Sequence, residues 1–276
     1  MDVLTPYSLE EALEVRFTHP EATVVAGGTD LMVDVNARRI RPTALLDLSR
    51  VDELQSWGRD NGRVFVGAGM TFARIARELS EFRPLVEAAH SVASPQIRNR
   101  ATIGGNLATA SPAGDSIPVL SAYDADVVVA SSSAWMRRIP LGEFLVGPKR
   151  TSLAPDELIV GVEWQPVPGP GSFAKIGRRS AMVIAVASVC LQVDDERHGV
   201  RLALGSVGPT VLRARQAEEF AEALDWSDPA TLAEFGRLAA AEAQPIDDLR
   251  GSAAYRRHVV QVLARRLLAQ AEEVRC

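Results

Sequence analysis

The segment VVAGGTDLMV, residues 24–33, decides how the N-terminal part of the chain folds, because it places a glycine pair between two apolar runs. The first run is typical of a short buried strand, and the second predicts a helix from Leu31 to about Arg39. Glycine tolerates positive φ and has no Cβ, so Gly27-Gly28 can point successive N–H groups at one ligand. The start of the helix would add its own free N–H groups. The segment therefore predicts an anion cradle, with a plain strand-to-helix turn as the alternative.

The residues around Gly27-Gly28 predict a βαβ unit. The run ALLDLS (44–49) is typical of another buried strand, so strand, helix and strand follow one another over 22–48. Ser8 and Glu11 have the spacing of a capping box, which predicts a helix before the first strand. Ligand sites in such units lie at the carboxyl ends of the strands, which is where the glycine pair is expected.

A second glycine pair, Gly104-Gly105, lies in ATIGGNLATASPAGDSIPVL (101–120). Two corners of one type, each with outward N–H groups, would suit the two phosphates of a dinucleotide. Neither corner matches G-x-G-x-x-G or G-x-x-x-x-G-K-[ST], which disfavours a nicotinamide-binding Rossmann domain or an NTPase. FAD is the common dinucleotide that remains. Asp115 could accept hydrogen bonds from ribose hydroxyls, or it could be a turn-forming aspartate.

The remainder of the chain predicts a mixture of strands and helices. The breaker cluster QPVPGPGS (165–172) predicts a domain boundary. Before it, the patterns predict strands in 63–71, 124–132 and 157–164 and helices from Thr71 and Pro84. After it, they predict long strands in 181–194 and 199–208 and helices at about 213–224, 231–242 and from Ser252.

Composition restricts the function classes. The chain has 276 residues and a net charge of −5, so it shows no electrostatic footprint for nucleic acid or an anionic membrane. We find no signal peptide and no spanning segment, which favours the cytoplasm. Cys190 and Cys276 cannot hold an iron–sulfur cluster within one chain, and the four histidines have no metal-ligand spacing. We therefore expect no metal site and nominate no catalytic residue.

Taken together, four stretches make the chain resemble a known family. VVAGGTDL, TIGGNLATASPAGD, PDELIVGVEW (155–164) and FAKIGRRSAMVIAVASV (173–189) resemble the FAD-binding medium subunit of the molybdenum hydroxylases. This family includes the xanthine dehydrogenase flavin domain and the carbon monoxide dehydrogenase medium subunit, and the resemblance covers nearly the whole chain.

The resemblance implies an α+β fold. A two-lobed FAD-binding region of the vanillyl-alcohol-oxidase type (PCMH-type) would span 1–167, with lobes of about 1–55 and 56–167. A C-terminal domain of antiparallel sheet and helices would span 168–276.

The resemblance also implies which residues hold FAD. The first pyrophosphate loop would comprise Val24, Val25, Ala26, Gly27, Gly28, Thr29, Asp30 and Leu31. The second would comprise Thr102, Ile103, Gly104, Gly105 and Asn106. Asp115 would bind the ribose or ribityl side, Val92 would lie near the adenine, Thr109 would lie by the isoalloxazine, and Ile159 and Lys175 would also contact FAD.

The function implied is electron transfer as one subunit of an oxidoreductase complex. A large molybdopterin-binding subunit and a small [2Fe–2S] subunit would be the partners, in a dimer of heterotrimers. Electrons would pass from the clusters through FAD to an external acceptor. Two alternatives are a stand-alone flavin-dependent oxidase or dehydrogenase with its own substrate pocket, and a subunit that has lost flavin. The paired glycines and Asp115 speak against the last.

Overall fold

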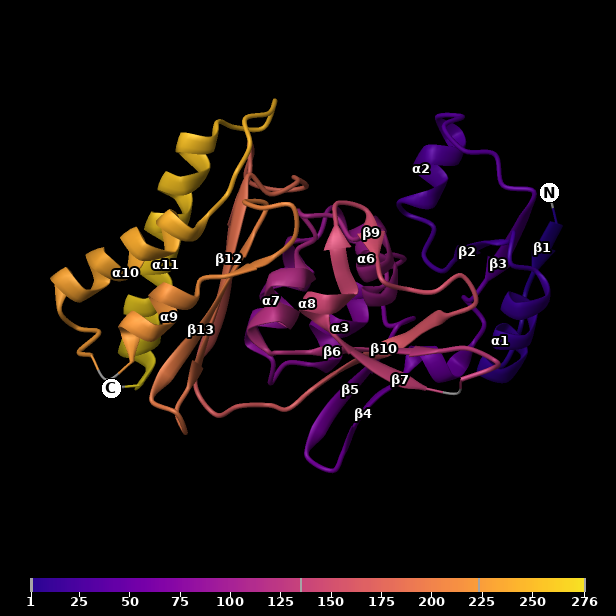
Figure 1. Cartoon of the computed structure of the whole chain (residues 1–276), viewed down its shortest axis with the longest axis horizontal. Coiled ribbons are helices and arrows are strands. Elements are labelled where there is room, and N and C mark those ends of the chain that lie inside the picture. Colours follow the sequence, from indigo (N-terminus) through magenta and orange to yellow (C-terminus); the bar gives the residue numbers. More distant parts are fainter. Residues whose placement is uncertain (1, 135, 223, 276) are drawn as a thin grey trace.

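The computed structural model describes residues 2–134, 136–222 and 224–275, and three sheets follow one another along its long axis (Figure 1). The N-terminal lobe lies at one end, a five-stranded sheet with its helices lies in the middle, and a four-stranded sheet lies at the other end. Three buried apolar clusters hold the parts together, and the central sheet contributes residues to the cluster of the N-terminal lobe as well as to its own. This mixed α+β architecture agrees with the fold class that the sequence predicts.

The N-terminal lobe is the predicted βαβ unit with one further strand. Its parallel sheet has the order β1-β3-β2, and α1 and α2 precede and follow β2 in the chain. Ser8 caps α1 by accepting a hydrogen bond from the Glu11 N–H. Helix α2 ends three residues before Arg39, because Arg38 takes a left-handed φ of 56°. The bounds are β1 Asp2–Leu4, α1 Leu9–Thr18, β2 Thr23–Val25, α2 Leu31–Asn36 and β3 Ala44–Asp47.

The central sheet is antiparallel, with the order β4-β5-β10-β6-β7. All seven residues of β10 are buried, because the strand has partners on both edges and both of its faces are covered. A hairpin that the sequence analysis missed joins β4 to β5 through Asn61 and Gly62, both at positive φ, as a two-residue turn requires. The strands are β4 Trp57–Asp60, β5 Arg63–Gly67, β6 Asp126–Ala130, β7 Arg137–Pro140 and β10 Leu158–Trp164.

Short helices surround this sheet and fill the space toward the C-terminal sheet. Thr71 caps the predicted helix after β5, and its hydroxyl accepts from the Arg74 N–H. The elements are the 3₁₀ helix η1 Asp52–Gln55, α3 Phe72–Glu78, α4 Arg83–Ser91, α5 Pro95–Arg98, α6 Ile103–Thr109, α7 Ser116–Ala122 and α8 Leu141–Phe144, with a small hairpin of β8 Leu145–Gly147 and β9 Arg150–Thr151.

The C-terminal part is an antiparallel sheet in the order β11-β12-β13-β14. In Figure 1, α9, α10 and α11 cover one face of this sheet, and α7 lies on the other. The strands are β11 Gly171–Ile176, β12 Ala187–Asp194, β13 Gly199–Gly205 and β14 Leu212–Arg213. The helices are α9 Arg215–Ala221, α10 Pro229–Glu242 and α11 Ala253–Arg275.

Two expectations for this part need correction. The strand expected over 181–194 begins only at Ala187, because 177–186 is the connection between β11 and β12 and leaves Met182 and Ile184 exposed. Strand β11 is a further element that the sequence pattern did not predict. The helix expected at about 213–224 spans Arg215–Ala221, and residue 223 lies outside the described residues.

Candidate functional site: a cavity between three parts of the chain

A cavity of about 1160 Å³ lies where the N-terminal lobe, the central helices and the C-terminal sheet meet. The N-terminal lobe contributes the run 24–31. The central part contributes residues from α6 and the loop that follows it, and the C-terminal part contributes 182–184, 206–209 and residues in 244–256. Pockets for small molecules commonly measure about 300–1,000 Å³, so this one has room for a ligand of dinucleotide size.

The first glycine pair forms the wall of this cavity, and its backbone amides are free. Among the described residues, the N–H groups of Gly27, Gly28, Thr29 and Asp30 donate to no other group of the chain. Gly28 has a φ of 72°, as the corner predicts. A Cβ on Gly27 would lie 2.0 Å from the Arg100 carbonyl oxygen, so this glycine permits a close approach of two backbone segments.

The second glycine pair differs from the first, and the expectation of two corners of one type is wrong. Gly104 and Gly105 form the first turn of α6. Their N–H groups are already used: Gly104 donates to the Ala68 carbonyl at 2.9 Å and Gly105 to Thr102 Oγ1 at 3.0 Å. A Cβ on Gly104 would lie 2.6 Å from the Ala68 Cβ, so this glycine lets α6 pack closely behind the cavity wall.

The two glycine segments are nevertheless brought together. Arg100, which contacts Gly27, comes three residues before α6. At the other end of α6, the Thr109 hydroxyl donates to Asp30 Oδ2 at 3.4 Å. Segments more than 70 residues apart in the sequence thus form one continuous wall.

Asp115 occupies the N-cap position of α7 but does not cap the helix. Its Oδ2 accepts instead from Lys175 Nζ on β11 at 2.5 Å and from the Ser91 hydroxyl at 3.0 Å. Its Oδ1 is buried and has no hydrogen-bond partner. Burial raises the pKa of the Asp115 carboxyl above its usual value, and the Lys175 ammonium and the Ser91 hydroxyl oppose that shift.

Most of the residues named from the sequence surround the cavity. Those that line it are Val24, Val25, Ala26, Gly27, Gly28, Thr29, Asp30, Leu31, Val92, Thr102, Gly105, Asn106, Thr109 and Asp115. Four others do not: Ile103 and Gly104 are buried behind the wall, Ile159 belongs to the central core, and Lys175 pairs with Asp115.

The C-terminal side of the cavity is formed by residues that the sequence did not predict. Its lining includes 182–184, Ser206, Gln244, Ile246, Asp248, Arg250 and Arg256. Ser206 follows β13 with a φ of 63°, and Arg256 donates to the carbonyls of Ser206 and Val186. The only sequence signal here is the glycine-rich run GSVGP (205–209) at the end of a predicted strand.

The described residues offer no cluster for a metal. No group of three His, Cys, Asp or Glu side chains within this part of the chain is arranged to hold an ion. Cys190 is fully buried, burial raises the pKa of its thiol, and Cys276 lies outside the described residues. None of the described helices is both long enough and apolar enough to cross a membrane.

Comparison with known proteins places the chain among flavin-carrying subunits. Residues 1–166 match the family described as the FAD-binding domain in molybdopterin dehydrogenase, and residues 172–271 match the carbon monoxide dehydrogenase flavoprotein C-terminal domain.

Two curated proteins and one solved structure illustrate similarity over almost the full length of both chains. The chain is 34% identical to the 6-hydroxypseudooxynicotine dehydrogenase complex subunit alpha of Paenarthrobacter nicotinovorans, over 98% of this chain and 94% of the relative. It is 29% identical to the xanthine dehydrogenase FAD-binding subunit of Escherichia coli O157:H7, over 96% and 93%. A chain of quinoline 2-oxidoreductase from Pseudomonas putida 86 has a TM-score of 0.90 and 27% identity, over 99% and 97%.

Proposed function

The chain belongs to the FAD-binding medium subunits of the molybdenum hydroxylases, and from this premise we propose that it is the electron-transfer subunit of such a complex. FAD is the cofactor of this subunit, which is part of an oxidoreductase. FAD, when bound, supplies redox chemistry, which on this proposal links [2Fe–2S] clusters of a small partner subunit to an external acceptor. A large molybdopterin-binding subunit would carry substrate oxidation, in a cytoplasmic dimer of heterotrimers.

One observation carries the assignment of the binding site: the cavity wall combines free donors with a free acceptor. The amides of Gly27 to Asp30 would bind the pyrophosphate, because unpaired backbone N–H groups favour phosphate oxygens. Asp115 Oδ1, buried without a partner, would accept a hydrogen bond from a ribose or ribityl hydroxyl. The residues present therefore fit a dinucleotide that has both phosphates and hydroxyls.

The other proposed contacts follow from where the residues lie. Val92, Thr102, Gly105, Asn106 and Thr109 line the cavity and would contact FAD through side chain or backbone. Lys175 would act by holding Asp115 in its ionised form and fixed in place. Ile103, Gly104 and Ile159 would support the wall from behind. In this scheme the chain's own residues bind and orient the cofactor, and no proton transfer is required of them.

The test is anaerobic reduction of the purified, flavin-loaded chain. We expect the chain to release FAD and no FMN on denaturation, and its flavin to stay oxidised when aldehydes, purines or N-heterocycles are added. Co-expression with a molybdopterin-binding subunit and a [2Fe–2S] subunit should make the flavin bleach with the substrate of the complex. Stopped-flow absorbance of the flavin measures both outcomes.

A chemical reductant serves as the control, because it must bleach the flavin in the isolated chain and so show that the flavin is competent. If an organic substrate reduces the isolated chain at a catalytic rate, the chain is a stand-alone oxidase or dehydrogenase. FMN in the extract would contradict the reading of the cavity as a dinucleotide site.

A further inference from the structure

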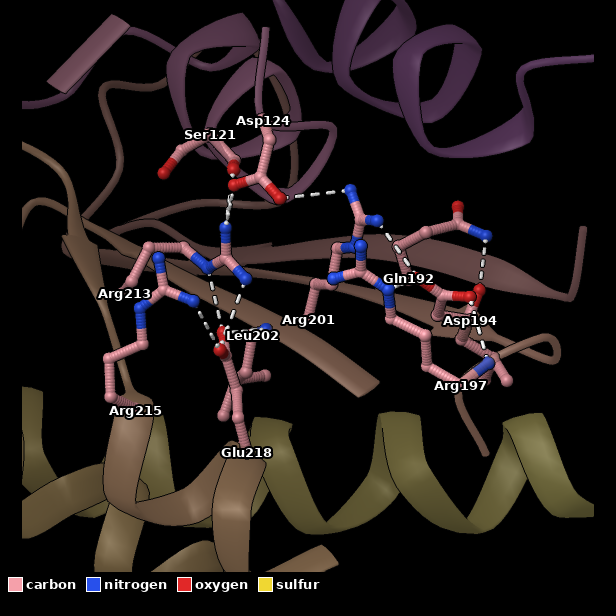
Figure 2. Close-up of polar contacts among 11 residues, drawn as sticks. Ser121, Asp124, Gln192, Asp194, Arg197, Arg201, Leu202, Arg213, Arg215 and Glu218 are labelled. Atoms are coloured by element: carbon pink, nitrogen blue, oxygen red, sulfur yellow. Dashed lines mark hydrogen bonds and ion pairs between the residues drawn. The ribbon is translucent and has the colours of Figure 1, made fainter. Parts of the chain in front are cut away.

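Helix α7 packs on β12 and β13, and an aspartate beyond each of its ends adds a polar contact to the C-terminal sheet; Arg213 Nη1 also donates to the Ser121 carbonyl of α7 at 2.9 Å. At the N-terminal end, Asp115 pairs with Lys175 of β11. At the other end, Asp124 lies between Arg201 of β13 and Arg213 of β14, as Figure 2 shows. Arg201 Nη1 is 3.0 Å from Asp124 Oδ2, and Arg213 Nη1 donates to Asp124 Oδ1.

The backbone at Asp124 is one that glycine normally supplies. The Asp124 N–H bonds the Ser121 carbonyl and the Ala125 N–H bonds the Leu120 carbonyl, which is the Schellman arrangement at a helix end. Asp124 takes the left-handed position of this motif, with a φ of 50°. Aspartate adopts this conformation less readily than glycine, so the backbone alone does not explain the residue. Its carboxylate is the feature that glycine lacks.

Each arginine has a second carboxylate partner, which it shares with another arginine: Asp194 also pairs with Arg197, and Glu218 also pairs with Arg215. Arg201 keeps an ion pair with the buried Asp194 at 2.8 Å, and Arg213 keeps one with the buried Glu218 at 2.7 Å. Figure 2 shows these two pairs within the C-terminal part and Asp124 reaching them from α7. Asp124 therefore adds a third carboxylate to a cluster of four arginines, and it is the one carboxylate of the three that comes from the end of α7.

The position of α7 decides where the free oxygen of Asp115 lies. Asp124 is nine residues beyond Asp115, about 13 Å along a helix that rises ~1.5 Å per residue. Among the described residues, Lys175 is the hydrogen-bond partner of Asp115 on the sheet, and Ser116 at the start of α7 donates to Asn106 of α6 at 2.8 Å. A shift of α7 along the sheet would therefore move Asp115 relative to both Lys175 and the cavity wall.

We propose that Asp124 is a positioning residue for the flavin site: it holds the far end of α7 on β13 and β14, and thereby fixes Asp115 Oδ1 at the cavity. This inference rests on the proposed role of Asp115 in binding FAD. Asp124 itself does not line the cavity.

Asp124→Gly tests the proposal cleanly, because glycine keeps the left-handed helix end and removes only the carboxylate. We expect the dissociation constant of FAD from the full-length chain to rise about tenfold, within the range of coupling between residues of one network. The midpoint of thermal unfolding of the deflavinated chain should fall by less than in Lys175→Met, because Asp124 is 51% exposed and both arginines keep another carboxylate partner. Fluorescence titration of the deflavinated chain with FAD gives the affinity.

Two further variants separate positioning from general damage. Asp194→Asn removes the other carboxylate partner of Arg201 but does not touch α7, so FAD affinity should stay within about twofold of the wild type. Asp115→Asn should itself weaken FAD, and Asp124→Gly should add almost nothing in that background, because its effect passes through Asp115.

Each remaining outcome overturns a different statement. If Asp115→Asn leaves FAD affinity unchanged, the proposed role of Asp115 fails and this inference fails with it. If Asp115→Asn weakens FAD but Asp124→Gly does not, the role of Asp115 stands and the positioning role of Asp124 is wrong. If Asp115→Asn and Asp124→Gly each raise the dissociation constant of FAD by the same factor alone and in combination, Asp124 does not act through Asp115.

Discussion

Gly27→Ala is expected to abolish retention of FAD. The new Cβ would lie 2.0 Å from the Arg100 carbonyl oxygen and 2.7 Å from its carbon, and both are backbone atoms that no rotamer change can move. The loop must therefore withdraw from the segment before α6, and its free amides move with it. Hydrogen bonds to charged groups contribute about 1.5–3 kcal/mol each, so losing two of them weakens FAD by ~100-fold or more.

Gly28→Ala is the matched control in the same loop. Its Cβ would have ordinary contact, 3.4 Å from Met32 Cγ, and only the φ of 72° is unfavourable to alanine. That conformation costs roughly 1–2 kcal/mol in an L-residue, which predicts a loss of FAD affinity no larger than about 30-fold. The ratio of flavin to protein after gel filtration distinguishes the two variants. Stoichiometric FAD in Gly27→Ala would show that the loop tolerates displacement.

Sequence patterns correctly predicted those elements whose ends are set by neighbouring residues in the chain. The first glycine corner, the capped helix after Ser8 and the strand now seen as β10 depend on residues within one short window. The hairpin turn at Asn61-Gly62 was equally local, and its Asn-Gly dipeptide is a strong hairpin signal that could have predicted β4.

The features that were missed depend on packing between distant segments. Gly104-Gly105 has the same letters as the first pair, yet it is helical: the Ala68 carbonyl accepts the Gly104 N–H, and the capping Thr102 hydroxyl accepts the Gly105 N–H. The apolar run 181–186 has strand composition, but β11 pairs with β12 only as far as Ala187, so the run becomes a loop at the cavity.

The residues of the candidate site also divide into those with a local sequence signal and those that depend on distant contacts. Glycine and aspartate candidates could be named one by one, because each has a local chemical reason to bind phosphate or hydroxyl groups. The partnership of Asp115 with Lys175, 60 residues apart, has no local signal. The contact of Asp124, at the end of α7, with arginines of β13 and β14 has no local signal either.

Lys175→Met is expected to destabilise the chain strongly, because it leaves the Asp115 carboxylate buried without its cation. The two side chains are 10% and 8% exposed, and removing one partner of a buried pair costs about 3–5 kcal/mol. For a protein of this size that corresponds to a drop on the order of 10 °C in the unfolding midpoint. Differential scanning calorimetry of the deflavinated chain measures it.

The loss of folding stability caused by Lys175→Met should depend on pH, and the titration of Asp115 sets the direction. Burial already raises the pKa of this carboxyl, and losing the ammonium raises it further. A carboxyl whose pKa is higher in the folded state than in the unfolded state stabilises the fold at low pH, and that contribution is lost as the pH rises through the folded-state pKa. The difference in unfolding midpoint between wild type and Lys175→Met should therefore be smallest in acid and grow toward neutral pH.

Asp115→Asn combined with Lys175→Met identifies the cause. With no carboxylate left to ionise, the double variant should regain part of the stability lost by Lys175→Met, and its difference from the wild type should no longer follow the raised pKa of Asp115. Unfolding midpoints across a pH series for all four proteins give the comparison. Simple addition of the two single effects, or a Lys175→Met deficit that is constant with pH, would mean that the lysine acts through its bonds to the Ser91 and Val183 carbonyls instead.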